Sequence, residues 1–209
     1  MDKNLEQKFA DLKEDEVLEA VRQGLDGGTD PQEILKACQN AMNIVGEKFE
    51  KGEYFISDLM LSGQIFKQVN EMLKAKFGSG ESSASAGTVV IGTVAGDIHD
   101  IGKDLVVGLL ESNNFKVIDL GVDQPKEVFV EKVKETNAPV VALSGLLTIA
   151  FDAMREIITA LEDAGLRDKV KVMIGGGTVS QTVCEYTGAD GWGDNAQIAV
   201  KLCREWMGR

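Results

Sequence analysis

Hydrophobic positions change their spacing near the middle of the chain. In the first 77 residues, apolar side chains recur every three or four positions, beginning with Leu5, Phe9 and Leu12. The same spacing continues over 17–25, 34–49 and 59–73, and it is the period of an amphipathic helix. These stretches predict a four-helix bundle whose Met and Phe side chains fill its core.

The second half of the chain alternates two patterns. Short apolar, β-branched runs predict strands at 88–94, 115–120, 139–143 and 170–174, with a weaker one at 189–192. Helical patterns follow them near 101–113, 125–137, 150–164, 179–187 and from about 195. Continuous apolar strands that alternate with helices are typical of a parallel sheet covered on both faces. The fold class is therefore α + α/β, a four-helix bundle followed by a Rossmann-like (flavodoxin-like), doubly wound sheet of five parallel strands.

A stretch of small residues separates the two halves. Residues 78–87 read Gly-Ser-Gly-Glu-Ser-Ser-Ala-Ser-Ala-Gly, a composition that cannot bury an apolar face and is typical of a flexible linker. We therefore expect a helical domain over 1–77, a linker over 78–87 and a sheet domain over 88–209.

Composition narrows the class of protein. The chain has 34 acidic against 22 basic side chains, a net charge of −12, which argues against binding nucleic acid or an anionic membrane surface. No apolar run reaches the about 20 residues of a membrane span, and the three cysteines show no paired spacing. We expect a soluble cytoplasmic protein. The acidic surface either attracts partners with basic docking faces or only maintains solubility.

The chain contains a single histidine, His99, which excludes any site that needs two histidines of one chain. Ligands of parallel α/β sheets bind at the carboxyl ends of the strands. Three segments lie at such ends and are candidates for chemistry, residues 95–102, 144–150 and 175–180.

The first segment is Gly96-Asp-Ile-His-Asp-Ile-Gly-Lys103. In an extended loop, Asp97 and His99 lie two positions apart and can point to the same side. A carboxylate that accepts one imidazole N–H leaves the other ring nitrogen free to bind a metal. The alternative is that His99 and Asp100 only cap the helix that follows.

Nucleotide-binding motifs fit the first segment poorly. Five residues separate Gly96 from Gly102, and Lys103 is followed by Asp104, whereas a phosphate-binding loop needs four intervening residues and then Lys-Ser or Lys-Thr. Asp119 ends the second strand, where an acid that binds ribose would lie, but the glycine fingerprint of a dinucleotide site is missing.

The other two segments are rich in small residues. Ser144-Gly-Leu-Leu-Thr148 suits a narrow pocket with a few hydrogen bonds, or an ordinary turn. Gly175-Gly-Gly-Thr178 lets a flat or bulky group approach the backbone closely, or forms a turn. All three segments follow strands of one sheet, which favours a shared site.

Together the three segments resemble those of cobalamin-binding corrinoid proteins of methyltransferase systems. Residues 96–103 contain the Asp-x-His-x-x-Gly signature of that family, and Ser144–Thr148 and Gly175–Gly177 resemble its companion motifs. Gly52-Glu-Tyr-Phe-Ile56 is similar to part of the family's helical cap domain. The resemblance covers nearly the whole chain and extends to the cobalamin module of methionine synthase.

The resemblance implies a role for each matched residue. His99 would be the lower axial cobalt ligand in place of the cofactor's own base, and Asp97 would bond to its other ring nitrogen. Gly102 would leave room for the nucleotide tail of the cofactor. The implied contacts with cobalamin are Gly96, Asp97, Ile98, His99, Asp100, Gly102, Ser144, Leu146, Thr148, Gly175, Gly176 and Ala196.

One position departs from the pattern. Methionine synthase extends the His–Asp pair with a serine where this chain has Ala150. The hydrogen-bond relay should therefore end at Asp97 or continue through water.

The resemblance also implies the partners of a methyl carrier. A donor-specific methyltransferase, serving for example an O-demethylase, methanol, methylamine or betaine system, would supply the methyl group. A second methyltransferase with a tetrahydrofolate-type acceptor would take it, and a reductive activator would restore the cofactor. The helical domain would shield the reactive face and swing away on its linker. Two alternatives remain, a nicotinamide- or flavin-dependent oxidoreductase and a cobalamin-dependent sensor or regulator.

Overall fold

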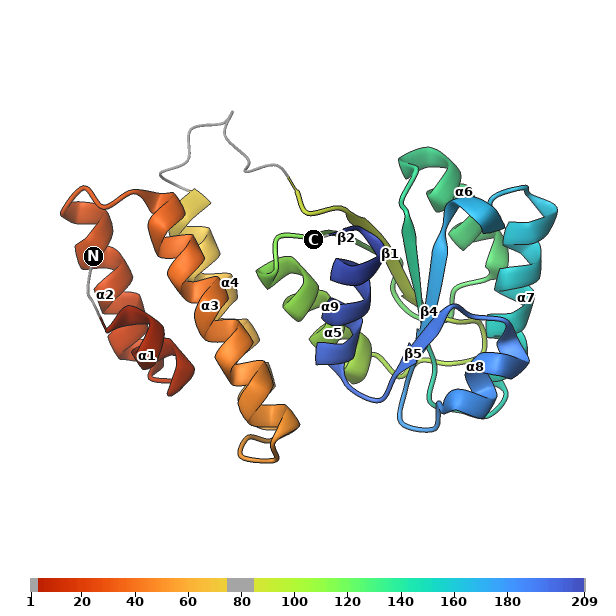
Figure 1. Cartoon of the computed structure of the whole chain (residues 1–209), viewed down its shortest axis with the longest axis horizontal. Coiled ribbons are helices and arrows are strands. Elements are labelled where there is room, and N and C mark those ends of the chain that lie inside the picture. Colours follow the sequence, from red (N-terminus) through yellow and green to blue (C-terminus); the bar gives the residue numbers. More distant parts are fainter. Residues whose placement is uncertain (1–3, 75–84, 209) are drawn as a thin grey trace. The chain divides into compact units, whose positions relative to one another are not determined.

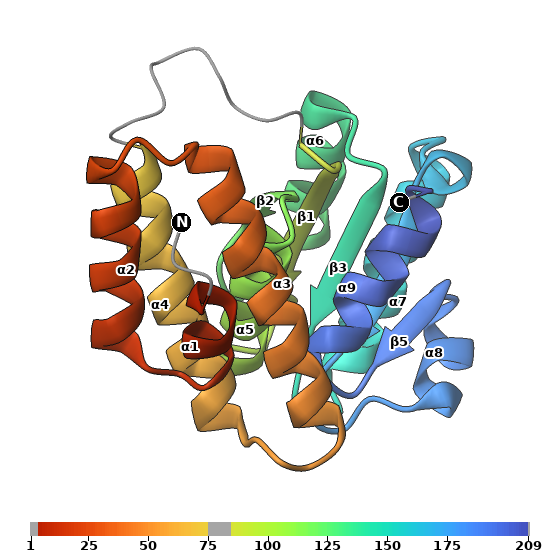
Figure 2. The ribbon, with the colours of Figure 1, turned by 60° about the vertical axis from the view of Figure 1, so that its left-hand side comes forward.

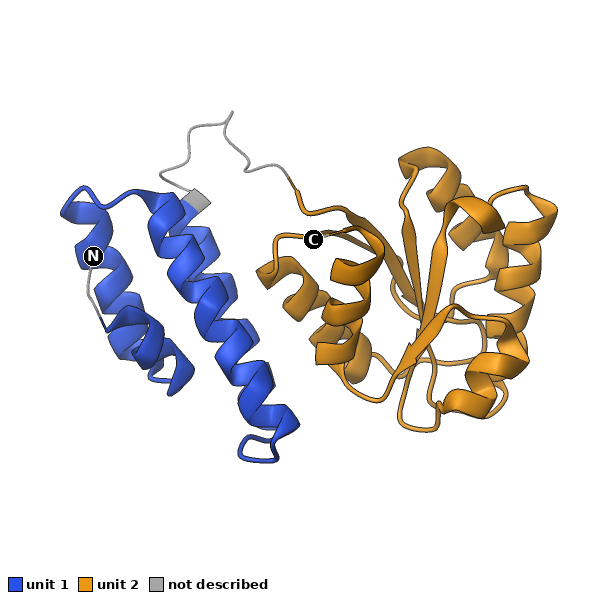
Figure 3. Ribbon diagram, in the orientation of Figure 1, with its two compact units in different colours: residues 1–84 blue, residues 85–209 orange. Residues whose placement is uncertain are grey.

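The computed structural model describes residues 4–74 and 85–208, which belong to two compact units. Unit 1 falls within residues 1–84 and unit 2 within residues 85–209 (Figure 3). The expected linker over 78–87 lies outside the described residues except for its last three. Those three are attached to unit 2, because Ala86 N–H donates to the Asn114 carbonyl at 2.8 Å and Ser85 Oγ accepts from Lys116 N–H at 3.1 Å.

The described part of unit 1 is helical throughout. Its elements are α1 (Leu5–Ala10), α2 (Glu14–Asp26), α3 (Pro31–Glu50) and α4 (Ile56–Lys74). Figures 1 and 2 show α2, α3 and α4 lying side by side. The start of α3 is fixed by Asp30, whose side chain accepts a hydrogen bond from Gln32 N–H at 2.9 Å. Phe9 and Phe66 meet edge to face in the core, so the predicted bundle is confirmed.

Unit 2 is the predicted α/β fold. Its elements are β1 (Thr88–Thr93), α5 (Ile101–Ser112), β2 (Lys116–Asp119), α6 (Lys126–Thr136), β3 (Val140–Ser144), α7 (Ala150–Asp163), η1 (Arg167–Lys169), β4 (Lys171–Gly175), α8 (Gln181–Thr187), β5 (Gly191–Gly193) and α9 (Ala196–Trp206). All strand pairs are parallel, in the order β2-β1-β3-β4-β5. Helices α5 and α9 cover one face, and α6, α7 and α8 cover the other (Figure 1).

The strand order indicates at which end of the strands a ligand would bind. Because β1 and β3 are neighbours while β2 lies on the far side of β1, the chain leaves these two strands in opposite directions, and ligands bind at the carboxyl ends beside such a reversal. None of the helices within 4–74 and 85–208 combines the length and apolar character that crossing a membrane requires.

Candidate functional site

Four strands end level with one another at the carboxyl edge of the sheet. Thr93 of β1 pairs with Ser144 of β3, Ser144 pairs with Gly175 of β4, and Gly175 pairs with Gly193 of β5. The three predicted segments leave this row after β1, β3 and β4. The register therefore brings them to one place.

Asp97 and His99 form a hydrogen-bonded pair in the first segment. The Asp97 side chain is fully buried, whereas the His99 side chain is 49% exposed. Asp97 Oδ1 accepts a hydrogen bond from His99 N–H at 2.9 Å and lies 2.7 Å from the ring nitrogen Nδ1. Nε2 of His99 makes no hydrogen bond within the part of the chain that the structure describes. With the proton on Nδ1, this half-exposed ring presents a free nitrogen lone pair.

The second oxygen of Asp97 ties the first segment to the second. Oδ2 accepts hydrogen bonds from the backbone N–H groups of Leu146, at 2.6 Å, and Leu147, at 2.9 Å. Burial raises the pKa of this carboxyl, but the hydrogen bonds from Leu147, His99 and Leu146 outweigh burial and hold its pKa far below the ordinary value. Asp97 is therefore a carboxylate with four N–H partners.

Further bonds hold the first segment in its conformation. Gly96 has a φ of 81°, and its N–H donates to Asp123 Oδ1 at 2.8 Å. The buried Thr93 hydroxyl donates to the His99 carbonyl at 3.1 Å, and Asp123 N–H donates to the Asp97 carbonyl at 3.0 Å. The sequence reasoning missed Thr93 and Asp123, because nothing in their local pattern marks them as partners of this loop.

The second and third segments are bonded to each other. Gly145 N–H donates to the Gly175 carbonyl at 3.1 Å, and the Thr178 hydroxyl donates to the Leu146 carbonyl at 2.7 Å. At Gly176, with a φ of 143°, a Cβ atom would lie 1.9 Å from the Gly145 carbonyl oxygen. Glycine at 176 is therefore a requirement for this close packing of backbones.

The structure also shows where the Asp97 interactions end. Ala150 is fully buried and carries no hydroxyl. Among the described residues, the side chain of Asp97 is bonded only by His99 and the two leucine amides. Two backbone N–H groups thus occupy the oxygen that faces away from His99.

The remaining predicted residues line the same edge with fewer bonds. Asp100 stands at the N-cap of α5, but its side chain makes no capping hydrogen bond, so the capping alternative has no support from Asp100. A Cβ atom on Gly102 would meet nothing within 4 Å. Thr148 is exposed, and Ala196 is buried in the first turn of α9, behind the Asn195 cap.

Exposed apolar side chains are concentrated on the two segments that Asp97 joins. Large hydrophobic residues are exposed at Ile98, Ile101, Leu146, Leu147 and Ile149. All five belong to the two segments that Asp97 joins, and the one other such residue in the described part of unit 2 is Tyr186. A concentration of exposed apolar surface at one edge marks a binding surface.

Lys103 and Asp119, which a nucleotide site would use, are bonded to each other. The Lys103 side chain is 3% exposed and pairs with Asp119 and Asp104. Burial lowers the pKa of Lys103, but the bonds to these carboxylates outweigh burial and raise its pKa above the ordinary value. Asp119 also accepts a hydrogen bond from Gly121 N–H at 2.9 Å. Because both side chains are engaged in the fold, neither is available for phosphate or ribose.

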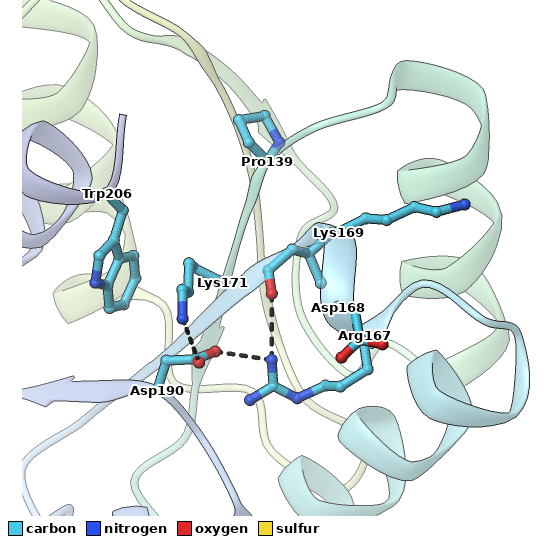
Figure 4. A pocket seen from close by; sticks show the side chains of 8 residues that line it. Pro139, Arg167, Asp168, Lys169, Lys171, Asp190 and Trp206 are labelled. Atoms are coloured by element: carbon cyan, nitrogen blue, oxygen red, sulfur yellow. Dashed lines mark hydrogen bonds and ion pairs between the residues drawn. The ribbon is translucent and has the colours of Figure 1, made fainter. Parts of the chain in front are cut away.

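A cavity lies at the opposite, amino edge of the sheet. It measures about 510 Å³ and lies beside the starts of β3 and β4 (Figure 4). Asp190 bridges Arg167 at 2.9 Å and Lys171 at 3.0 Å in its wall. These charged groups satisfy one another, and the three predicted segments do not reach this edge.

Two family models match the chain. A B12 binding domain matches residues 87–201, and a second model, also described as a B12 binding domain, matches residues 2–74. The two matches fall on the sheet unit and on the helical unit.

Named relatives match this chain over nearly its full length. Dimethylamine corrinoid protein 1 of Methanosarcina acetivorans is 42% identical over 93% of this chain and 92% of its own. A cobalamin-binding protein from Desulfitobacterium hafniense is 41% identical, with a TM-score of 0.81 over 97% of this chain and 96% of that structure. The methanol:cobalamin methyltransferase complex of Methanosarcina barkeri matches with a TM-score of 0.84 and 28% identity over 98% of this chain and 78% of that one.

Proposed function

The chain belongs to the family of B12-binding corrinoid proteins, and we propose that it carries methyl groups on cobalamin between two methyltransferases. The observation that carries this proposal is the Asp97–His99 pair with its free, half-exposed Nε2. In this proposal His99 is the lower axial ligand of cobalt, in the base-off/His-on form.

The described residues fit such a cofactor. No group of three or more metal-binding side chains occurs among them, so a metal held by His99 would need its remaining ligands from a cofactor, and the ring nitrogens of a corrin would supply them. When bound, the corrinoid cobalt accepts a methyl group and releases it again. Asp97 fixes the tautomer and orientation of His99 and strengthens its electron donation. Ile98, Ile101 and Leu147 are exposed on the two segments that Asp97 joins and would contact a flat, largely apolar ring.

We assign the nucleotide tail to the neighbouring strand ends. Ser144 ends β3, the neighbour of β1, and Gly175 ends β4, the next strand of the sheet. Gly102 faces open space at the start of α5. Thr148, Gly176 and Ala196 extend this surface in our proposal. Small residues at these positions support a tail that passes close to the backbone.

We propose that the helical unit acts as a cap that protects the bound cofactor between encounters. Unit 1 carries its own exposed apolar group, in which Phe55 is 70%, Ile56 54% and Met60 52% exposed. The loop before them is anchored, because the Tyr54 hydroxyl donates to the Ala10 carbonyl at 2.8 Å. Shortening the expected linker over 78–87 should slow methyl transfer and leave cobalamin affinity unchanged; equal transfer rates would contradict the cap role.

The partners follow from the chemistry of a carrier. We propose a donor-specific methyltransferase for a small methylated compound such as a methylamine or methanol, as the names of the relatives suggest. A second methyltransferase with a tetrahydrofolate-type acceptor and a reductive activator complete the system. Three free, buried cysteines favour the reducing cytoplasm as its location. Capture of candidate methyltransferases by the immobilised, cobalamin-loaded chain tests these assignments.

Reconstitution tests the proposal directly. The purified chain mixed with hydroxocobalamin should turn red and keep the colour through gel filtration, whereas an oxidoreductase or a chain without affinity for cobalamin should elute colourless. The His99→Ala variant should fold and bind cobalamin, but its methylated form should have a base-off absorption spectrum. A His-on spectrum in that variant would overturn the assignment of the ligand.

A further inference from the structure

Gln197 in the first turn of α9 has a buried, unpartnered oxygen. Within the described residues, Gln197 Oε1 is the one buried side-chain nitrogen or oxygen atom without a hydrogen-bond partner, and the residue is 6% exposed. Its backbone N–H is satisfied by Asn195 Oδ1 at 3.0 Å. Buried polar atoms are nearly always paired, since leaving one unpaired is unfavourable. An unpaired acceptor at this place indicates a missing donor.

The helical spacing places Gln197 on the side of α9 that is bonded to the end of α5. Helices α9 and α5 pack together on one face of the sheet (Figure 1). At the far end of α9, Arg204 donates to Asn113 Oδ1 at 2.5 Å, and Asn113 directly follows α5. Gln197 precedes Arg204 by seven residues, about two helical turns, so the two side chains leave α9 on the same side.

Open space lies at the same end of this helix pair. Helix α5 follows β1 and α9 follows β5, so both begin at the carboxyl edge of the sheet, where His99 lies. The first turn of α5 contains Gly102, at which an added Cβ atom would meet nothing within 4 Å. The unpaired oxygen of Gln197 and the open space at Gly102 therefore lie at the same end of the two helices, the end nearest the proposed cofactor.

We propose that Gln197 binds the nucleotide tail of the corrinoid, its Oε1 accepting a hydrogen bond from a ribose hydroxyl or from the amide N–H of the tail's linker. This inference rests on the proposed function. An acceptor oxygen selects these donor groups and not the phosphate of the tail. Gln197 then distinguishes complete corrinoids from those without a tail, a role separate from the cobalt ligation by His99.

Binding of two corrinoids tests this inference. The wild-type chain and the Gln197→Met variant are titrated with hydroxocobalamin and with cobinamide, which has the corrin ring but no nucleotide. Methionine keeps the length of the side chain and removes the acceptor. Gln181→Met is the control, because the Gln181 amide already has two partners, Trp192 at 2.9 Å and Glu185 at 2.9 Å.

The inference predicts about tenfold weaker cobalamin binding by Gln197→Met and unchanged cobinamide binding. Unchanged affinity for both corrinoids would overturn the inference. Equal weakening for both corrinoids would show that Gln197 contacts the corrin ring and would also overturn the inference. Failure of the wild-type chain to bind either corrinoid would instead refute the proposed function. Without cofactor, the variant should unfold at the wild-type temperature or higher. A lower unfolding temperature would show that the amide is already paired, against the inference.

Discussion

One oxygen of Asp97 holds His99 at two points, the backbone N–H at 2.9 Å and the ring nitrogen Nδ1 at 2.7 Å. The first bond shapes the loop and the second orients the imidazole. The other oxygen of Asp97 is bonded to Leu146 and Leu147 beyond β3. The position of His99 Nε2 is therefore set by two strand ends at once, with a single buried carboxylate between them.

This arrangement predicts unequal costs for the two residues of the pair. Asp97→Ala leaves the N–H groups of His99, Leu146 and Leu147 without their acceptor, so unit 2 should lose about 3 to 5 kcal/mol of unfolding free energy. Urea unfolding followed by tryptophan fluorescence measures this loss, because Trp192 and Trp206 are the only tryptophans and both lie in unit 2.

His99→Ala is the matched comparison. The His99 side chain is half exposed, so its removal should cost no more than about 1 kcal/mol. Equal losses in the two variants would show that Asp97 has no structural role beyond its contact with the imidazole.

Close backbone packing predicts a large effect at Gly176. A Cβ atom there would lie 1.9 Å from the Gly145 carbonyl oxygen, so Gly176→Ala must displace the second segment and should cost more than about 3 kcal/mol. Gly165→Ala is the control, since Gly165 has a φ of 66° but no atom within 4 Å of the added Cβ. The control should cost about 1 kcal/mol from backbone strain alone. Similar losses at both positions, by urea unfolding, would contradict the packing.

Because an added side chain at Gly102 would meet open space, substitutions there should affect cobalamin binding without lowering the stability of the cofactor-free chain. Gly102→Ala should keep or raise the stability of the cofactor-free chain, because Ala favours the helix by up to about 1 kcal/mol. Gly102→Leu should fold as well, but its larger side chain should weaken cobalamin binding more than tenfold. Cobalamin affinities are measured by equilibrium dialysis. Affinities equal to wild type in both variants would show that the nucleotide tail does not pass Gly102.

The ion pairs of Asp190 at the amino edge of the sheet predict that the stability of unit 2 depends on pH, independently of the cofactor. Burial raises the pKa of Asp190, but hydrogen bonds from Val172, Arg167 and Lys171 outweigh burial and place its pKa below the ordinary 3.8. The carboxylate therefore stabilises the fold above pH 3.8, and this contribution is lost as the pH falls below 3.8 through the lower folded-state pKa.

Asp190→Asn should accordingly destabilise unit 2 by about 2 kcal/mol at neutral pH. The difference from wild type should shrink once the pH falls below 3.8. Urea midpoints measured across this range test the sign, and a difference that grows on acidification would refute it. Cobalamin affinity at neutral pH should remain that of the wild type, because this edge is opposite His99.

The sequence allowed the elements and the central pair to be predicted because both depend on nearby residues. Helical and strand periods are local, and Asp97 and His99 are two positions apart. The partners that fix the site are distant in sequence. Leu146 is 49 positions from Asp97 and donates through its backbone, so its side-chain type carries no signal. The burial of Gln197, likewise, depends on how α9 packs against α5.

The identity of the cobalt ligand is the central claim, and the single histidine makes it directly measurable. The chain is produced with histidine enriched in the heavy nitrogen isotope, loaded with cobalamin and reduced to the cobalt(II) state for electron paramagnetic resonance. If His99 is the axial ligand, each cobalt line that is split into three by ordinary nitrogen will be split into two by the heavy isotope. An unchanged threefold splitting would show that the cofactor's own base remains bound to cobalt, contrary to the proposed His-on form.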